Sequence, residues 1–235
     1  MTEVDPKLVS QNDTALEEGT FPSWLRVGFW VCVVIAVAVA VRRVVALASP
    51  SQSAPPQMAA LNTIFASHAA LTLAHVLFAL AFVLLAPFAL SRRFGGRKGV
   101  ERAFLVLGLV VGATAYGMSI STAVGGWIER CAVLLFDTIF LFSLLRAYWY
   151  GSRNEPLLKR RWLIRSVAVL LGIATTRPVM GVFFATAQLT HLTPHQFFGI
   201  AFWIGFSINT LIIELWLRSL DSRLRTNPTR LQPSH

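Results

Sequence analysis

Six long apolar stretches, separated by short polar segments, dominate the pattern of the chain. A helix that rises about 1.5 Å per residue needs roughly 20 apolar residues to cross a hydrocarbon layer about 30 Å thick. Each stretch reaches this length, and none alternates with the period of two expected of a transmembrane strand. The pattern therefore predicts an all-α integral membrane protein, a six-helix bundle with spans at residues 25–47, 60–90, 103–124, 127–150, 162–188 and 194–218.

Basic residues are distributed unevenly between the spans. The loops after the second and fourth spans and the C-terminal tail are rich in Lys and Arg, whereas the loops 48–57, 125–126 and 189–194 contain neither. Because basic loops remain in the cytoplasm, this alternation predicts that both termini are cytoplasmic and that the membrane is a cell inner membrane. The predicted organisation is a polar cytoplasmic tail, a six-helix domain and a basic cytoplasmic tail, at residues 1–24, 25–218 and 219–235.

Composition narrows the class of protein further. Of the 235 residues, 55% are hydrophobic and 14% are charged, whereas about a quarter are charged in a typical soluble domain. This excludes a soluble globular enzyme, a disordered chain and a secreted disulfide scaffold. The net charge of +10 is explained by basic cytoplasmic loops, so it favours anionic lipid at the cytoplasmic face as a partner and not nucleic acid.

Four apolar stretches each carry a polar side chain at a similar depth. With a rise of about 1.5 Å per residue, His75, Tyr116, Asp137 and Arg177 all lie about 20–24 Å above the cytoplasmic boundary. Polar groups at this depth are costly and need partners, so we expect them to form an intramembrane pocket in the outer half of the membrane. Asp137 and Arg177 are the first pair expected, either as a structural link between two helices or as part of a ligand site.

Histidines provide a second candidate chemistry. His68, His75, His191 and His195 all fall in the outer half or at the outer interface, and imidazole is a common ligand of haem iron and transition metals. The pocket would then hold a single haem b, ligated by His75 with His191 or His195, or a quinone whose carbonyls meet His75 and Arg177. The alternative is that the interfacial histidines simply face water and headgroups.

Further polar residues suggest structural roles. Arg165 and Glu214 each lie only about 5 Å from the inner face, where we expect them to form an ion pair between the last two spans. Asn209 lies between the two levels as part of a polar core. Cys32 and Cys131 differ in depth by more than the Cα separation of about 7 Å that a disulfide tolerates, so both thiols should be free.

One stretch resembles a known family. The segment KRRWLIRSVAVLLGIATTRPVMG, residues 159–181, is similar to the motif His-Arg-Arg-Trp-Met-Ile-Arg-Ser, followed by a later arginine, of an uncharacterised bacterial family of predicted multi-pass membrane proteins, a domain of unknown function. The resemblance extends over residues 60–218, and Lys159 stands where the family usually has histidine. The matching residues are Arg160, Arg161, Trp162, Ile164, Arg165, Ser166 and Arg177.

The resemblance implies a fold and a membrane location but no activity. Its six-helix layout is similar to that of the cytochrome b561 group, which is an analogy at the level of fold. No Walker loop, HExxH or GxSxG motif is present. The sequence therefore names no reaction, and whether the protein is an enzyme stays open. Two classes of function remain: a protein with a pocket for haem or quinone, and a non-enzymatic membrane subunit, scaffold or small-solute permease.

Overall fold

The computed structural model describes residues 21–48, 63, 66–91, 97–186, 189, 191 and 193–226. Within these ranges the chain is helical apart from short turns and connections, and it contains no strand. The helices are α2 (Ser23–Ala48), α4 (Ala69–Leu90), α5 (Lys98–Ser121), α6 (Gly126–Ser152), α7 (Pro156–Ala185) and α9 (Pro194–Thr226).

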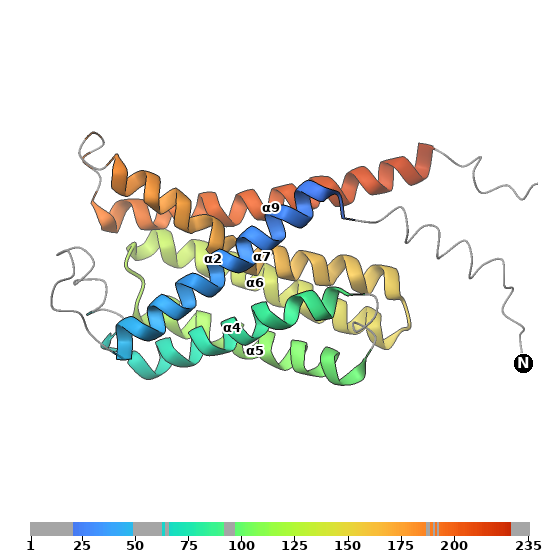
Figure 1. Ribbon diagram of the computed structural model, residues 1–235, viewed down its shortest axis with the longest axis horizontal. Coiled ribbons are helices and arrows are strands. Elements are labelled where there is room, and N and C mark those ends of the chain that lie inside the picture. Colours follow the sequence, from blue (N-terminus) through green and yellow to red (C-terminus); the bar gives the residue numbers. More distant parts are fainter. Residues whose placement is uncertain are drawn as a thin grey trace, which may run out of the picture.

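The helices run back and forth along one long axis (Figure 1). The start of α2, the end of α4, the start of α5, the α6–α7 connection and the end of α9 all lie at the same end of the molecule. Helix α7 packs against α2, α4, α6 and α9, while α2 lies diagonally across the bundle and contacts α4 and α7. Only Val33 of α2 is buried, so this helix is the most loosely attached of the described helices.

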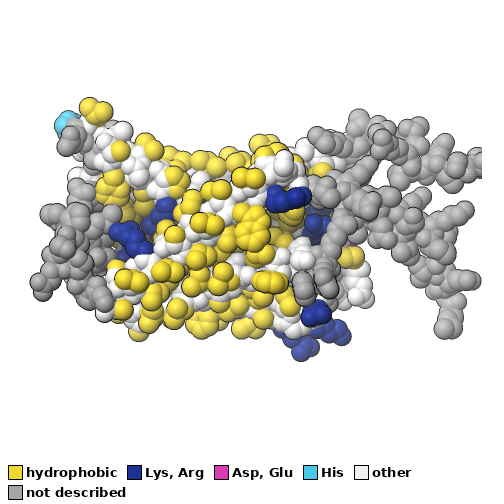
Figure 2. All heavy atoms as spheres, viewed as in Figure 1, with side chains coloured by type: hydrophobic (Ala, Val, Ile, Leu, Met, Phe, Trp, Pro, Cys, Tyr) yellow, Lys and Arg dark blue, Asp and Glu magenta, His cyan; other side chains and the backbone are white. Residues whose placement is uncertain are grey.

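Among the described helices, five are long and apolar enough to cross a membrane, namely α2, α4, α5, α7 and the part of α9 at His195–Leu220. Figure 2 shows a broad band of hydrophobic side chains across the middle of the face that it draws, with Lys and Arg side chains toward the ends of this face. An exposed apolar band of this kind suits contact with lipid acyl chains. The chain is therefore an all-helical membrane protein with several apolar spans.

Aromatic rings and glycines pack the interior. Phe82 of α4 stacks on Phe104 of α5 with 4.1 Å between the ring centroids. Phe140 of α6 meets the ring of Phe82 edge-on, with 5.5 Å between the centroids. In the seam between α7 and α9, Gly172 and Gly205 have no side chain and allow close approach of the two backbones. These contacts hold the helices that surround the site described below.

The observed helices extend beyond several of the predicted spans. Helix α5 begins at Lys98 and not at residue 103, α7 begins at Pro156 and not at 162, and α9 continues to Thr226. The reason is that the apolar pattern stops at the first charged residues, whereas a helix continues through charges that lie at the level of the headgroups. Helix α4 begins at Ala69. Most of residues 60–65 and of the two predicted tails lie outside the described residues.

Candidate functional site

A cavity of about 230 Å³ lies inside the bundle, with walls from all six helices. Most of its lining is apolar, including Val83, Val111, Val169 and Phe206. Mostly apolar walls with a few convergent polar groups are typical of small-molecule sites. The polar and charged lining residues are Arg43, Thr72, His75, Ser119, Thr122, Glu129, Asp137 and Arg177.

The structure brings three of the four predicted pocket residues to this cavity. His75 from α4, Asp137 from α6 and Arg177 from α7 all line it. Tyr116 does not, because its hydroxyl lies 2.5 Å from the Oγ1 of Thr138, at an exposed position between α5 and α6. Depth along a helix follows from the sequence, but the direction in which Tyr116 points around its helix does not.

Asp137 and Arg177 share the cavity without forming the predicted ion pair. Both residues lie in the described part of the chain, and no ion pair within 4.0 Å joins them. Asp137 is 8% exposed. Its Oδ2 and the Nε of Arg177 are buried and have no hydrogen-bond partner in the described part of the chain. Two residues that line the cavity therefore each have one buried polar atom that other described residues leave unsatisfied.

His75 is held by a hydrogen bond to the neighbouring helix. Its Nδ1 lies 2.9 Å from the Oγ1 of Thr114, and that hydroxyl also lies 2.8 Å and 2.9 Å from the carbonyl oxygens of Val110 and Val111. Because the single hydroxyl proton of Thr114 is donated to a carbonyl, the hydroxyl accepts from Nδ1–H of His75. This assignment leaves Nε2 of His75 as the acceptor.

The other candidate histidines do not line the cavity. His68 is exposed at the start of α4, where its Nδ1 lies 3.1 Å from the Oγ of Ser67. His191 is exposed with a φ of 53°, and His195 is exposed in the first turn of α9. Among the described residues there is also no group of three or more His, Cys, Asp or Glu able to hold a metal ion. His75 is thus the one of these four histidines that reaches the cavity.

Two charged lining residues were not expected in the pocket from the sequence. Glu129 is 8% exposed, and its Oε2 accepts the backbone N–H of Gly125 at 2.5 Å, just before α6. The available signal in the sequence was the position of Glu129 in the first turn of α6. Acidic residues at such positions stabilise a helix, so this signal indicates a structural role and not a place in the pocket. Arg43 reaches the cavity from α2. The Arg42–Arg43 pair suggests side chains directed to the outer headgroups, and no pattern in the sequence indicates that Arg43 turns inward.

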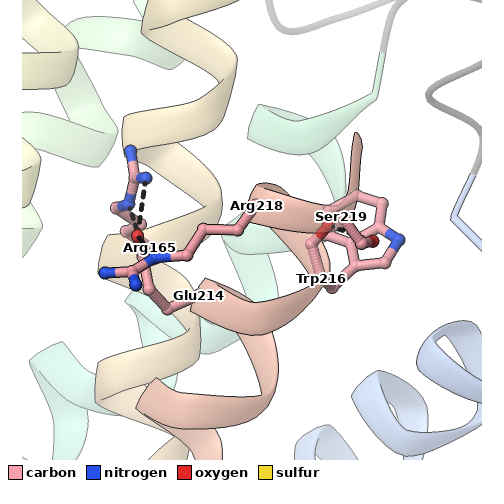
Figure 3. Close-up of polar contacts among 5 residues, drawn as sticks. All are labelled: Arg165, Glu214, Trp216, Arg218 and Ser219. Carbon is pink, nitrogen blue, oxygen red and sulfur yellow. Dashed lines mark hydrogen bonds and ion pairs between the residues drawn. The ribbon is translucent and has the colours of Figure 1, made fainter. Parts of the chain in front are cut away.

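A separate ion-pair network lies near the end of α9. The Nε of Arg165 donates to Oε2 of Glu214 at 2.9 Å, and its Nη2 lies 3.4 Å from Oε1. The Nε of Arg218 donates to the same Oε1 at 3.2 Å (Figure 3). The side chains of Arg165 and Glu214 are 25% and 32% exposed, so water weakens the pair. Neither residue lines the cavity, and the network links α7 to α9.

Asn209 also links α7 to α9. Its Nδ2 donates to the carbonyl of Ala168 at 3.3 Å, and its Oδ1 accepts from the hydroxyl of Thr175 at 2.7 Å. Both cysteines are free thiols, and the Sγ of Cys32 lies 3.9 Å from the same hydroxyl. Asn209 therefore lies in a polar contact between helices, away from the cavity lining.

Comparison with known proteins identifies a family but no function. The family described as "Predicted membrane protein (DUF2306)" matches residues 72–217, which begin in α4 and end in α9 and so leave α2 outside. No curated protein and no solved structure matches the chain, so the similarity of layout to the cytochrome b561 group stays a prediction. Since the match covers more than half of the sequence and includes the stretch around Trp162, the chain belongs to this family of predicted membrane proteins of unknown function.

Proposed function

We propose that the protein binds the ring of a small lipid-soluble ligand of the quinone class in the cavity between its helices. The observation that carries this proposal is the pair of unsatisfied buried atoms, Oδ2 of Asp137 and Nε of Arg177. A buried polar atom without a partner costs about 1–3 kcal/mol. A ligand that offers an acceptor to Arg177 and a donor to Asp137 removes both costs.

A quinol has this combination of groups, and a quinone has the acceptor alone. A quinone carbonyl or a quinol oxygen accepts a hydrogen bond from Arg177, and a quinol hydroxyl donates to Asp137. Nε2 of His75 provides a second acceptor in the same cavity under the tautomer assigned above. The apolar walls, including Val83 and Val169, suit the faces of the ring. The proposed role is binding of this ring.

Size and ligation favour a quinone ring over haem b. The cavity, at about 230 Å³, is smaller than the roughly 300–1,000 Å³ of sites that enclose drug-sized molecules. A haem is at least as large as such molecules, whereas a quinone needs only its ring inside. Haem with two axial histidines also needs a partner for His75, and His191 and His195 lie outside the lining.

Helix α2 provides the route for the isoprenoid tail. Its contribution to the cavity wall consists of Ala36, Val39, Ala40 and Arg43. Only Val33 of this helix is buried, so α2 is held to α4 and α7 by few tightly packed side chains. A tail that leaves the cavity beside α2 reaches the acyl chains directly.

We further propose that α6 is a sixth span and that both termini are cytoplasmic in a cell inner membrane. Helix α6 runs from the end of α5 to the opposite end of the bundle, where α7 begins (Figure 1). The start of α2 and the end of α9 share that end with the start of α5 and the α6–α7 connection. Both of these regions are rich in Lys and Arg, which supports a cytoplasmic location. Green fluorescent protein fused after residue 235 should fluoresce, and a dark but stable fusion would contradict the topology.

Binding is best tested with decylubiquinone and the full chain in nanodiscs. Trp203 is the reporter, because its ring lies 5.8 Å from that of Phe136, which lines the cavity. We expect saturable quenching of tryptophan fluorescence that is largely lost in Trp203→Phe. Arg177→Met should weaken binding at least roughly tenfold, as expected for one hydrogen bond from a charged group.

Arg218→Gln is the matched control. It also removes one arginine, but Arg218 is paired with Glu214 outside the cavity, so decylubiquinone binding should be unchanged. Absence of saturable quenching in the wild type, or equal binding by the wild type and Arg177→Met, would overturn the proposal. A Soret band in protein purified from haem-replete cells would instead indicate haem.

A further inference from the structure

A second cluster of arginine and aromatic side chains lies in the C-terminal half of α6, beyond the cavity. The Cζ of Arg146 lies between 5.1 and 5.8 Å from four ring centroids. Three of these rings are three or four residues away along α6, so they share its face, and the fourth comes from α7. The four rings belong to Phe142, Trp149, Tyr150 and Trp162.

Arg153 extends this cluster toward the end of the helix. It follows Arg146 by seven residues, which places both on the same face of α6. Its Cζ lies 3.9 Å from the ring centroid of Trp149, so this one indole contacts both guanidinium groups. Stacking on an aromatic face restricts a guanidinium without neutralising its charge.

Neither arginine has a carboxylate partner in the described part of the chain. Arg146 donates from Nη2 to the hydroxyl of Tyr150 at 3.0 Å, and its Nε is buried without a partner. Arg165 and Arg218, in contrast, share Glu214. Two neighbouring positive charges are therefore left without a counter-ion from the described residues.

The cluster faces outward at the level expected of a membrane interface. Trp149 is 39% exposed and Phe142 is 54% exposed. It lies close to the α6–α7 connection, at the end of the bundle where α9 also ends (Figure 1). Tryptophan and tyrosine concentrate at headgroup level, so phosphate groups of lipids are the anions nearest to this face.

We propose that Arg146 and Arg153 bind the phosphate group of an anionic phospholipid, with Trp149 holding the two guanidinium groups in place. Arginine binds phosphate with parallel hydrogen bonds, and the two side chains present donors on one face of α6. The exposed apolar side chains of Phe142 and Leu145, next to Arg146, provide contact for acyl chains. A soluble phosphate shares the headgroup chemistry and lacks this second contact.

The test measures which lipids stay bound to the full-length protein. Purified protein is exchanged into mixed phosphatidylcholine and phosphatidylglycerol, and bound lipids are counted by native mass spectrometry. The wild type should retain phosphatidylglycerol preferentially. Arg146→Gln/Arg153→Gln should lose this preference by at least roughly tenfold, the effect of one charge-assisted hydrogen bond. Arg218→Gln, which removes a paired charge at the same end, should keep it.

A single-residue variant and a competition with inorganic phosphate distinguish lipid binding from misfolding and from binding of a soluble anion. Arg153→Gln alone changes only an exposed residue at the end of α6, so it preserves the fold and should still weaken the preference several-fold. Inorganic phosphate at millimolar concentration should not displace the lipid, and displacement by phosphate alone would assign the site to a soluble anion. Equal retention by the wild type and both arginine variants, or an equal loss in Arg218→Gln, would overturn the proposal.

Discussion

Gly205 provides the sharpest test of the packing that positions the cavity. A Cβ atom at Gly205 would lie 2.5 Å from Cγ2, 2.6 Å from the backbone nitrogen and 2.8 Å from Cα of Thr176. Two of these atoms are backbone, so α7 and α9 must separate to accommodate a methyl group. Thr176 directly precedes Arg177, and the separation therefore also moves the cavity's arginine.

Gly205→Ala should destabilise the protein by about 1–3 kcal/mol, the usual cost of overpacking a close contact. Gly181→Ala is the matched control, because a Cβ atom at Gly181 meets nothing within 4 Å. This control should be neutral or slightly stabilising, since alanine favours a helix over glycine by roughly 0.5–1 kcal/mol. The measurement is reversible unfolding by sodium dodecyl sulfate in mixed micelles, followed by circular dichroism. Equal stability of the two variants would refute the close α7–α9 seam.

Three further substitutions test the cavity and the ion pair of Glu214. Arg177→Met should leave unliganded stability unchanged or raise it, because it removes the buried Nε that has no described hydrogen-bond partner, and the contact of Nη1 with the Sδ of Met180 at 3.8 Å is weak. A thermal melt that falls by several degrees would show that the arginine is structural. Ala115→Phe projects into the cavity, so it should reduce decylubiquinone binding, measured by fluorescence quenching, while preserving the helical circular dichroism spectrum. Glu214→Gln should cost about 1 kcal/mol or less in the same unfolding assay, because its ion pair with Arg165 is partly exposed, and a loss of several kcal/mol would contradict this.

The apolar pattern was sufficient to locate the helices and the ends of two of them, but not the ends of the others. The span predicted at residues 25–47 corresponds to α2 at Ser23–Ala48, and the one predicted at 127–150 corresponds to α6 at Gly126–Ser152. The apolar pattern marks the boundary of the hydrocarbon layer, whereas the end of a helix is determined by its capping residues and the turn that follows. This is why the helix that starts at Pro156 is longer than its apolar part.

Depth along the helices was the most informative sequence signal for the site. It grouped His75, Asp137 and Arg177, all of which line the cavity. It also grouped Tyr116, which bonds instead to Thr138, because depth carries no information about rotation around the helix axis. For the same reason the sequence could not distinguish a shared cavity from a direct Asp137–Arg177 ion pair.

Lining residues of the cavity that lie outside the apolar centres of the spans were harder to recognise from the sequence. Glu129 lies in the first turn of α6 and Arg43 lies near the end of α2, and charged residues at such positions usually face headgroups and water. Their long side chains reach the cavity instead. A residue's backbone depth therefore underestimates how far its charged group extends into the bundle.

The proposed function places a quinone in the cavity beside Arg177 and Asp137. The most direct measurement is the quinone content of the purified protein, determined by solvent extraction and liquid chromatography with mass spectrometry. Wild type and Arg218→Gln should each carry quinone in proportion to protein, and Arg177→Met should carry little or none. Quinone-free wild-type protein, or the same quinone content in Arg177→Met as in the wild type, would contradict quinone binding in this cavity.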